Sequence, residues 1–265
     1  MESIYRFISF SSFVDTIQRG ALAFVQHSLW GDPYEGYIFK ALKTPEGQKK
    51  ILDMLRQLSP QLAKATYGTL LNIDSCIHGQ SWTKCPENEY LWRINCRNQD
   101  SIRIEISLDN INKLNQVKAY EIDYVNTTLE EDIKAIIIGV NKIDIAPILR
   151  RKRPEFSCEQ EIRLLSDIDL NYLPINRSHK MEVILEQFYK EGKITKNQLE
   201  YAMKNLTSES KPGYKYIEYN HIPGFIKSVM VSPNAEDWFV ETVETYCSTK
   251  NLHFVGKSQF HDLII

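Results

Sequence analysis

The chain has 265 residues, of which 43% are hydrophobic, 11% aromatic and 25% charged. This composition is typical of a folded globular protein and excludes disordered and fibrous classes. The 32 Lys and Arg residues nearly balance the 34 Asp and Glu residues, giving a net charge of −2. That balance excludes a global basic field for nonspecific nucleic-acid binding, so a nucleic-acid partner would need a local patch.

The sequence predicts a soluble, cytoplasmic protein with no membrane partner. Its five cysteines are odd in number and include no C-x-x-C pair, so their spacing indicates neither a disulfide framework nor a zinc site. Acidic Glu2 stands where a secretory signal would be positively charged. The longest apolar stretch, at 135–140, is far shorter than the roughly 18 residues of a membrane-spanning helix.

The first half of the chain predicts short strands separated by helices. In chain order the predicted elements are a strand at 3–10, a helix ending at Gly20, a strand at 21–25, a turn-rich loop at 29–37, helical segments across 45–72, an extended segment at 75–83 and a helix at 86–95. Ser11 or Ser12 is the expected cap of the first helix, Pro60 begins a new helical segment, and Pro86 fits a first helical position.

The second half continues this alternation. The predicted elements are a strand at 101–108, a short helix at 108–115, a strand at 117–125, a helix from Thr127 or Thr128 onward, a strand at 161–166, strands at 214–219 and 225–232, a helix at 235–249 and a strand at 252–258. Two amphipathic helices at 180–206 predict a helical hairpin insertion. We therefore expect one α+β domain, 1–265, with a mainly antiparallel, split sheet flanked by short helices.

Several common catalytic signatures are missing from the sequence. It contains no G-x-G-x-x-G, no G-x-x-x-x-G-K-[ST], no G-x-S-x-G and no H-E-x-x-H. Dinucleotide folds of the Rossmann type, P-loop enzymes, hydrolases with a nucleophile elbow and zincins therefore have no support. The six histidines show no metal-like spacing, and we predict no metal site.

The densest carboxylate feature is Glu159-Gln160-Glu161, followed by Ile162 and Arg163. On a strand, Glu159 and Glu161 would lie side by side while Gln160 and Ile162 face the core. Paired carboxylates shift each other's pKa and suit glycosidic chemistry, in which a cationic centre needs a nearby negative charge. The alternative is a solvated strand in which Arg163 simply pairs with Glu161.

An arginine in the first strand is the next feature of interest. Arg6 lies between Tyr5 and Phe7, where a planar guanidinium suits a carboxylate or the pyrophosphate of a nucleotide. An outward-facing Arg6 paired with an acid is equally compatible with the pattern.

Two aromatic segments could line a ligand site. The loop from Gly31 to Gly36 contains Tyr34, and a later segment contains Ser81 and Trp82. Turn geometry and core packing explain the same residues. The basic run 150–153 could grip phosphate, but a solvated loop is the simpler interpretation.

The motifs together resemble bacterial domain-of-unknown-function family 2971. They are YRF near the start, GDPYEG, SWT followed by E-x-x-LW, F-x-x-E-x-E-I-R, and I-x-x-V-x-V-x-P-x-A from Ile226 to Ala235. The chain departs from the family pattern at Gly31, Ser81 and Leu91. This resemblance implies a fold group without naming an activity.

The order of motifs also resembles ADP-ribosyltransferase-like proteins, including DNA-modifying toxin relatives. The resemblance implies that Arg6 holds the phosphates of NAD, that Tyr5 belongs to the same cofactor-binding set, and that Ser81 orients the nicotinamide ribose. It also implies that Trp82 or Tyr34 stacks on the nicotinamide. The implied catalytic residues are Glu161, which stabilises the ribosyl cation, and Glu159, which orients or activates the acceptor.

Three hypotheses follow. The first is an NAD-consuming transferase or glycohydrolase, acting on a nucleic-acid, protein or water acceptor, with a toxin or phage-defence role. The second is a metal-dependent nuclease or phosphodiesterase using Asp32, Glu35, Glu159 and Glu161 as ligands. The third is a noncatalytic nucleotide-binding or protein-binding module.

Overall fold

The computed structural model describes residues 2–32, 34–58, 60–61, 63–95, 100–138, 142–167, 189, 191–192, 195–199 and 213–260. These residues form a mostly antiparallel open sheet flanked by helices, which confirms the predicted α+β class. The strands of the main sheet are β1 (Ser3–Ser9), β2 (Ala21–Gln26), β3 (His78–Thr83), β4 (Ser101–Ser107), β5 (Val117–Glu121), β10 (Glu161–Ser166), β11 (Tyr214–Glu218), β12 (Ile226–Val231) and β13 (Phe254–Lys257).

Two small ladders accompany the main sheet. β6 (Asp123–Tyr124) pairs in parallel with β9 (Arg151–Lys152), and β7 (Ile137–Ile138) pairs with β8 (Lys142–Ile143). The α-helices are α1 (Phe10–Arg19), α2 (Tyr37–Ala41), α3 (Pro45–Leu58), α4 (Ala63–Ile73), α5 (Glu89–Asn95), α6 (Leu108–Asn112), α7 (Leu129–Ile136), α8 (Ala146–Leu149) and α11 (Asp237–Thr249). The short 3-10 helices are η1 (His27–Leu29), η2 (Asp74–Cys76) and η3 (Pro154–Glu159).

The main sheet splits along one edge of β3. On one side, β3 pairs with β10 over the register from Gly79 to Thr83. On the other side, β2 pairs with β3 at His78 and Gly79, whereas β1 pairs with β3 only at Thr83, opposite Tyr5. β1 and β2 therefore diverge beside the middle of β3, so the split expected from the sequence is present.

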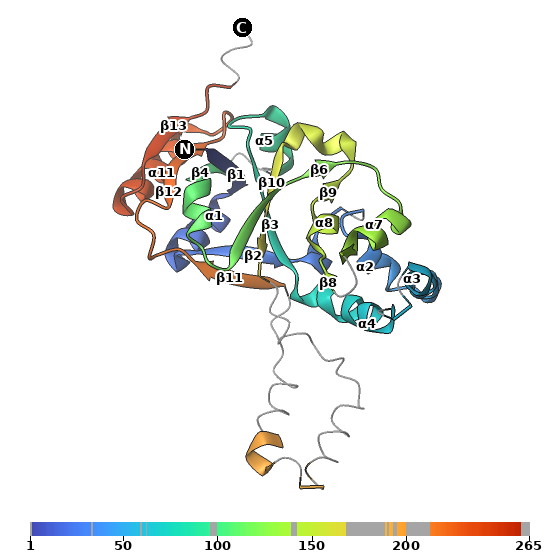
Figure 1. Cartoon of the computed structure of the whole chain (residues 1–265). Coiled ribbons are helices and arrows are strands. Elements are labelled where there is room, and N and C mark those ends of the chain that lie inside the picture. The colour runs from blue at the N-terminus through green and yellow to red at the C-terminus, as the bar shows by residue number, and fades with distance from the viewer. Residues whose placement is uncertain are drawn as a thin grey trace.

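Hydrophobic cores lie on both sides of this arrangement. One core combines the inward residues of β1, β4, β10 and β12 with α1 and α11, and a second is built by α2, α3, α4, α7 and α8. Figure 1 shows α1 and α11 at the left of the sheet and α2, α3, α4 and α7 at the right. The sheet is therefore held from both sides, with the divergence of β1 and β2 between them.

Local sequence chemistry explains the unit that carries Arg6. Ser9, rather than the expected Ser11 or Ser12, caps α1 by accepting a hydrogen bond from the Ser12 N–H, because β1 ends one residue earlier than predicted. Gly20 ends α1 with φ +59°, a left-handed conformation that glycine adopts without steric cost.

Other boundaries differ from the sequence-based expectations. Helix α5 begins at Glu89 rather than Pro86, because the Asn88 side chain accepts the Tyr90 N–H and sets the first turn there. The predicted strand at 117–125 is divided into β5 and β6 at Ile122, which is buried. The Thr128 cap is confirmed, with a reciprocal capping box to Glu131.

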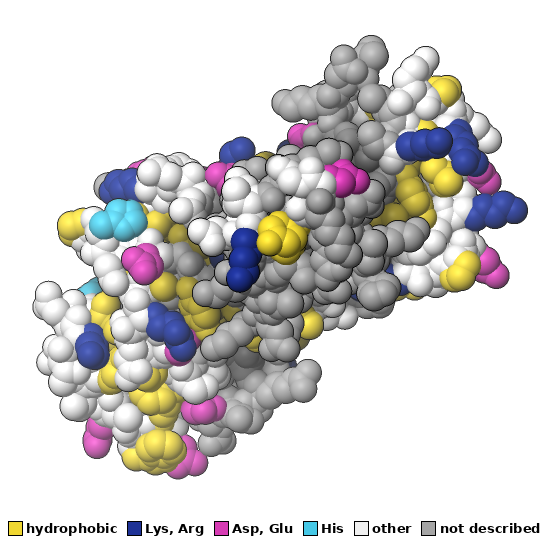
Figure 2. Space-filling view, turned by 90° about the horizontal axis from the view of Figure 1, so that it is seen from below, with side chains coloured by type: hydrophobic (Ala, Val, Ile, Leu, Met, Phe, Trp, Pro, Cys, Tyr) yellow, Lys and Arg dark blue, Asp and Glu magenta, His cyan; other side chains and the backbone are white. Residues whose placement is uncertain are grey.

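The predicted helical hairpin at 180–206 lies mostly outside the described residues. Within the described part of the chain, Cys85, Cys158 and Cys247 form no disulfide. No helix among the described residues has the length and apolar character needed to cross a bilayer. On the face shown in Figure 2, basic and acidic side chains are interspersed with hydrophobic ones.

Candidate functional site

A cleft of about 650 Å³ opens where β1 and β2 diverge from β3. Its wall includes Arg6 and its neighbours on β1, the loop following η1, the length of β3 from Gly79 to Thr83, and the segment from Lys152 to Glu161. These segments are far apart in sequence. The cleft therefore brings together Arg6, Ser81, Glu159 and Glu161, four of the residues predicted from sequence.

Glu161 is the buried anionic centre of the cleft. It is the first residue of β10, and only 3% of its surface is exposed. Ser81 Oγ donates to Glu161 Oε1 at 2.7 Å, Arg163 Nε donates to the same oxygen at 2.8 Å, and Lys152 Nζ lies 3.0 Å from Oε2. Burial alone would raise the pKa of Glu161, but the charges of Arg163 and Lys152 outweigh it and lower the pKa to about 2.

Glu159 lies close to Glu161, but not through the strand alternation that the sequence predicts. Glu159 ends η3 rather than lying on the strand, and Gln160 adopts a left-handed conformation with φ 42° and is exposed. The predicted strand alternation across 159–161 is therefore wrong, as is a core-facing Gln160. The two carboxylates still converge, because the turn at Gln160 redirects the chain and both carboxylates contact Lys152 Nζ.

The two glutamates have opposite electrostatic environments. Burial raises the pKa of Glu159, and the negative charges of Glu161 and Glu35 raise it further, which outweighs the contact with Lys152. The pKa of Glu161 is lowered instead. Two neighbouring carboxylates with pKa values pushed apart can take different roles, one as a permanent anion and the other as a proton acceptor or donor.

Arg163 is fully enclosed behind Glu161. Besides the contact with Glu161, its Nη1 donates to the Leu149 carbonyl at 2.8 Å and its Nη2 contacts Glu35 Oε1 at 3.0 Å. Its guanidinium lies 4.7 Å from the centre of the Trp30 ring. The ion pair between Arg163 and Glu161 that the sequence offered as an alternative is present, but it is buried and not solvated.

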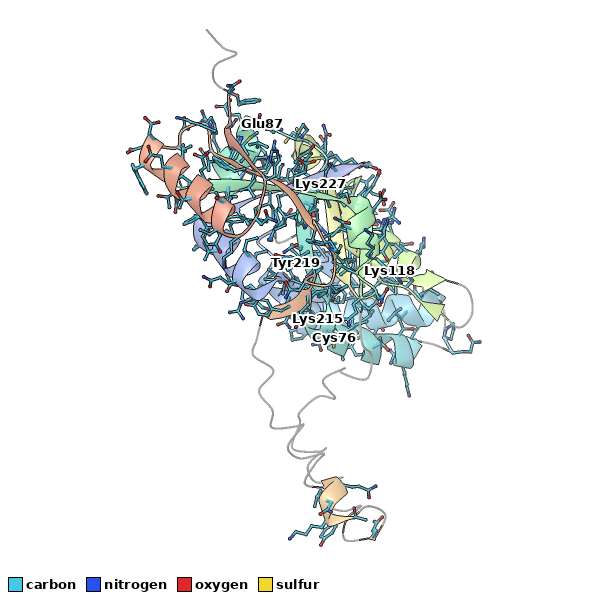
Figure 3. All side chains as sticks on the ribbon, turned by 90° about the vertical axis from the view of Figure 1, so that its left-hand side faces the viewer. Cys76, Glu87, Lys118, Lys215, Tyr219 and Lys227 are labelled. Carbon is cyan, nitrogen blue, oxygen red and sulfur yellow. The ribbon has the colours of Figure 1, made fainter. Side chains whose placement is uncertain are left out.

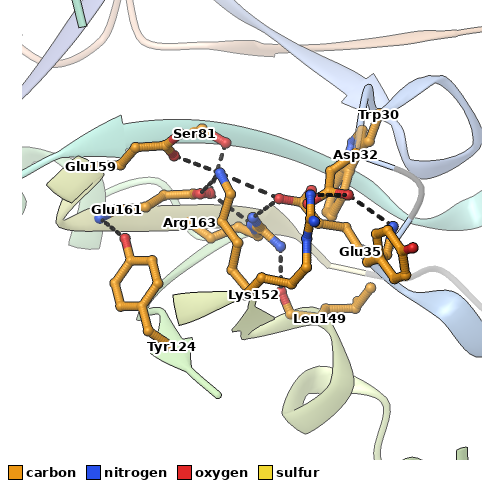
Figure 4. Close-up of polar contacts among 12 residues, drawn as sticks. Trp30, Asp32, Glu35, Ser81, Tyr124, Leu149, Lys152, Glu159, Glu161 and Arg163 are labelled. Carbon is orange, nitrogen blue, oxygen red and sulfur yellow. Dashed lines mark hydrogen bonds and ion pairs between the residues drawn. The ribbon is translucent and has the colours of Figure 1, made fainter. Parts of the chain in front are cut away.

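Lys152 joins three carboxylates within the cleft (Figure 4). Its Nζ lies 2.5 Å from Glu159, 3.0 Å from Glu161 and 3.4 Å from Glu35. The simpler interpretation of the basic run as a solvated loop is wrong for this residue, whose side chain is 10% exposed. Burial disfavours the charged amine, but Glu161 and Glu35 outweigh that cost and raise the pKa of Lys152.

Arg6 stands on the opposite wall of the cleft. It is partly exposed, and none of the side chains that the structure describes forms a hydrogen bond or an ion pair with its guanidinium. Burial against protein lowers the pKa of Arg6 to about 10, so the group remains charged at neutral pH. A guanidinium in the lining of a cleft, with no partner among the described side chains, is suited to binding an anion.

The predicted aromatic ligands have different surroundings. Tyr5 lines the cleft and packs under the Arg103 guanidinium, 4.9 Å from its ring centre. Tyr34 is 59% exposed, lies outside the cleft lining and is covered by Arg153 at 4.5 Å. Trp82 also belongs to the lining of the cleft, but it is 2% exposed and packed in the core, and its Nε1 donates to Gln80 at 2.8 Å. These positions do not support stacking of either Trp82 or Tyr34 on a ring bound in the cleft.

Acidic residues proposed as metal ligands are held by cations instead. Lys152 contacts three glutamates, and Arg153 Nη2 lies 3.5 Å from Asp32 Oδ1. Within the described ranges, no group of three or more His, Cys, Asp or Glu side chains could hold a metal ion. The arrangement thus resembles a network of ion pairs around a cleft.

Three functional side chains were not assigned from sequence. Lys152 was part of a run interpreted as solvated, Glu35 appeared only as a metal ligand, and Arg163 appeared only as a structural partner. The sequence did contain a signal for Lys152 and Arg163, because both are basic residues close in sequence to the Glu159 and Glu161 carboxylates and can act as their counterions. The comparisons with known proteins add nothing to these assignments, since no family model, curated protein or solved structure matches the chain.

Proposed function

We propose that the protein cleaves NAD between nicotinamide and ribose, as an ADP-ribosyltransferase-like enzyme or an NAD glycohydrolase. The observation that carries this proposal is the opposite charge on the two walls of one cleft. Arg6 supplies a cation that pairs with no side chain among the described residues, whereas three glutamates face two cations, Lys152 and Arg163, and leave one negative charge in excess. NAD itself has an anionic pyrophosphate and a cationic nicotinamide ring.

The spacing of the two walls suits a dinucleotide. Tyr5 pairs with Thr83, and Thr83 pairs with Glu161 on the following strand. Since neighbouring strands lie about 4.8 Å apart, the backbones of β1 and β10 are roughly 10 Å apart at this level. Tyr5 shares a sheet face with Thr83 and Glu161, whereas Arg6 projects from the other face of β1, and both residues line the cleft. In this proposal Arg6 holds the pyrophosphate while Glu161 and Ser81 face the nicotinamide ribose.

The proposed reaction begins with cleavage of the glycosidic bond. The bond between ribose C1′ and the ring nitrogen breaks, and its electron pair leaves with nicotinamide, which becomes neutral. The ribosyl group becomes an oxocarbenium ion, and the anionic Glu161 stabilises its positive charge. Because the low pKa keeps Glu161 ionised at neutral pH, this stabilisation requires no prior proton transfer.

The second half of the reaction transfers the ribosyl group to an acceptor. An acceptor hydroxyl, amine or water attacks C1′, and its proton passes to Glu159, whose raised pKa suits a general base. Water as acceptor gives ADP-ribose, and a protein or nucleic acid gives an ADP-ribosylated product. A toxin or phage-defence role is the biological setting we propose, in keeping with the motif order described above.

The decisive experiment measures nicotinamide release from NAD by the purified protein in the presence of a chelator. We expect Glu161→Gln, which preserves shape and removes the charge, to reduce the rate by about 100-fold or more. The matched control is Glu155→Gln on η3, because Glu155 is exposed and does not line the cleft. Equal rates for Glu161→Gln and the control would contradict the proposal.

A second candidate function is binding of a nucleotide without turnover. The specific observation that favours it is the saturation of Glu161, whose carboxylate already accepts contacts from Ser81, Arg163 and Lys152. This alternative predicts a rise in melting temperature on adding NAD, with no nicotinamide released and no effect of the chelator. Binding and release measured on the same preparation distinguish the two functions.

A further inference from the structure

Lys152 occupies the position in the cleft where carboxylates from three segments converge. Glu35 comes from the loop before α2, Glu159 from the end of η3, and Glu161 from the start of β10. Its ammonium group donates hydrogen bonds to Glu159 and Glu161 and forms an ion pair with Glu35. Lys152 therefore acts as the internal counterion of the anionic wall.

We propose that the Lys152 ammonium occupies a cation subsite, and that a ligand with a positively charged ring must displace it to bind. Lys152 thereby sets the selectivity of the cleft between cationic and neutral rings. The choice of a nicotinamide ring rests on the proposed function, but the inference concerns binding and not turnover.

The closeness of two positive charges, rather than the net charge of the network, favours this displacement. With Lys152 in place, the glutamates retain a single negative charge in excess, and a bound cationic ring would lie beside the ammonium. Like charges at contact distance in a partly enclosed site repel each other strongly. Once the ammonium withdraws, Arg163, which contacts Glu161 and Glu35, is the remaining cation of this network, and the excess negative charge rises from one to two. The ring then replaces the lysine as counterion.

The two cations of the network differ in their freedom to move. Lys152 belongs to β9, a strand of two residues that pairs with β6, and its side chain lines the cleft on a flexible four-carbon stem. Arg163 lies within β10 and is fixed by Glu161, Glu35 and the Leu149 carbonyl. Displacement therefore falls to Lys152, whose Nζ lies 4.9 Å from the centre of the Phe156 ring.

The test compares 1-methylnicotinamide, which is cationic, with nicotinamide, its neutral near-isostere, by isothermal titration calorimetry. We expect Lys152→Met to bind 1-methylnicotinamide about tenfold or more tightly than the wild-type protein does, and to bind nicotinamide within about twofold of it. The matched control is Lys118→Met on β5, which removes the same charge from an exposed site outside the cleft (Figure 3).

Three results would overturn the inference. The first is an equal change in affinity for 1-methylnicotinamide and nicotinamide in Lys152→Met. The second is a change in affinity in Lys118→Met as large as that in Lys152→Met. The third is that Lys152→Met does not bind 1-methylnicotinamide. If Lys152→Met fails to fold, the wild-type protein labelled with ¹⁵N lysine provides the test. Its Lys152 ammonium signal should be protected from exchange in the free protein and lose that protection with 1-methylnicotinamide; an unchanged or undetected signal counts against displacement.

Failure of this inference can be separated from failure of the proposed function. The calorimetry uses ring fragments and does not depend on cleavage of NAD. Charge-dependent binding in a protein that releases no nicotinamide would overturn the proposed function and leave the subsite standing. Release of nicotinamide from NAD, with ring binding that does not depend on the charge of the ring, would support the proposed function and overturn the subsite.

Discussion

Arg163 holds residues of the cleft in place although it does not itself line the cleft. Its planar guanidinium holds Glu161, Glu35 and a main-chain carbonyl simultaneously, with distances between 2.8 and 3.0 Å. Arginine and lysine are not interchangeable in such a position, because the ammonium of lysine cannot reproduce a fixed fork of donors. Arg163 is therefore a positioning residue for the Glu161 carboxylate.

Substitution of Arg163 by lysine tests whether its guanidinium positions Glu161. In Arg163→Lys we expect kcat for nicotinamide release to fall about 100-fold, since a carboxylate displaced by about 1 Å loses its alignment, while KM for NAD changes little. Arg151→Lys is the matched control, because Arg151 pairs with Asp132 at 2.6 Å and does not line the cleft. An unchanged kcat, or a KM effect alone, would show that Arg163 does not position the reaction.

Arg6 gives the second prediction at this scale. In Arg6→Met we expect KM for NAD to rise about tenfold or more, since charged hydrogen bonds to phosphate contribute about 1.5–3 kcal/mol. The same variant should bind ADP-ribose more weakly by calorimetry. Arg19→Met serves as the control, because Arg19 is exposed and pairs with Asp15 on α1. Equal KM values for the two variants would show that Arg6 does not contribute to NAD binding.

At the scale of elements, the loop from 30 to 36 connects η1 to α2 and inserts Glu35 into the cleft. Glu35 is 7% exposed and reaches both Arg163 and Lys152. The loop ends at Gly36, which has φ +57°, and a Cβ there would lie 2.2 Å from His27 Nε2. Because His27 is itself buried and paired with Asp74, it has little room to move.

Two glycines of this loop provide a matched comparison. We expect Gly36→Ala to lower the free energy of unfolding by about 2 kcal/mol, through backbone strain and the contact with His27. Gly31→Ala should stay within about 0.5 kcal/mol of the wild-type protein, since a Cβ at Gly31 meets nothing within 4 Å. Urea unfolding of both variants measures the difference, and similar losses at the two positions would refute this account.

Some elements of the fold could be predicted from the sequence, whereas the burial of Lys152 in the cleft and the conformation of Gln160 could not. Strand β4 and the Gly20 cap were predictable because their signals are local, namely strict alternation and a glycine after a helical pattern. Lys152 was not predictable, because its burial depends on carboxylates from positions 35, 159 and 161, which only the folded chain brings together. The left-handed Gln160 was also missed, because a non-glycine residue gives no local sign of that conformation.

For the whole molecule, two carboxylates on separate strands couple folding to pH. Glu105 on β4 and Glu161 on β10 both have a pKa lowered to about 2, although burial by itself would raise both. Hydrogen bonds from Lys227, Ser228 and Ser3 lower the pKa of Glu105. Both groups thus bind protons more weakly in the folded than in the unfolded chain.

The sign of the resulting pH dependence follows by linkage. The stabilisation from a carboxylate with lowered pKa is complete above its unfolded value, 4.5, and is lost as the pH falls from there towards 2. For Glu161 the loss is on the order of 3 kcal/mol. Glu159 acts in the opposite sense, because its raised pKa gives a contribution that is present below 4.5 and lost as the pH rises.

Urea unfolding at a series of pH values tests this prediction. We expect the free energy of unfolding of the wild-type protein to fall between pH 4.5 and 2, and the slope to be smaller in Glu161→Gln. Glu155→Gln, at an exposed position, should keep the wild-type slope. A slope in Glu161→Gln equal to that of the wild-type protein would show that Glu161 does not carry the acid sensitivity.

The divergence of β1 and β2 has a consequence for how this architecture can vary. The wall with Arg6 joins β3 through a single register position, Tyr5 opposite Thr83, whereas Ser81 and Glu161 share a continuous ladder. β1 pairs along its whole length with β4, so the two strands would pivot together about that position without breaking any hydrogen bond between β3 and β10. Substitutions near the pivot can lengthen or shorten the gap between the two charged walls, which adapts the cleft to ligands of different length while its carboxylates stay in place.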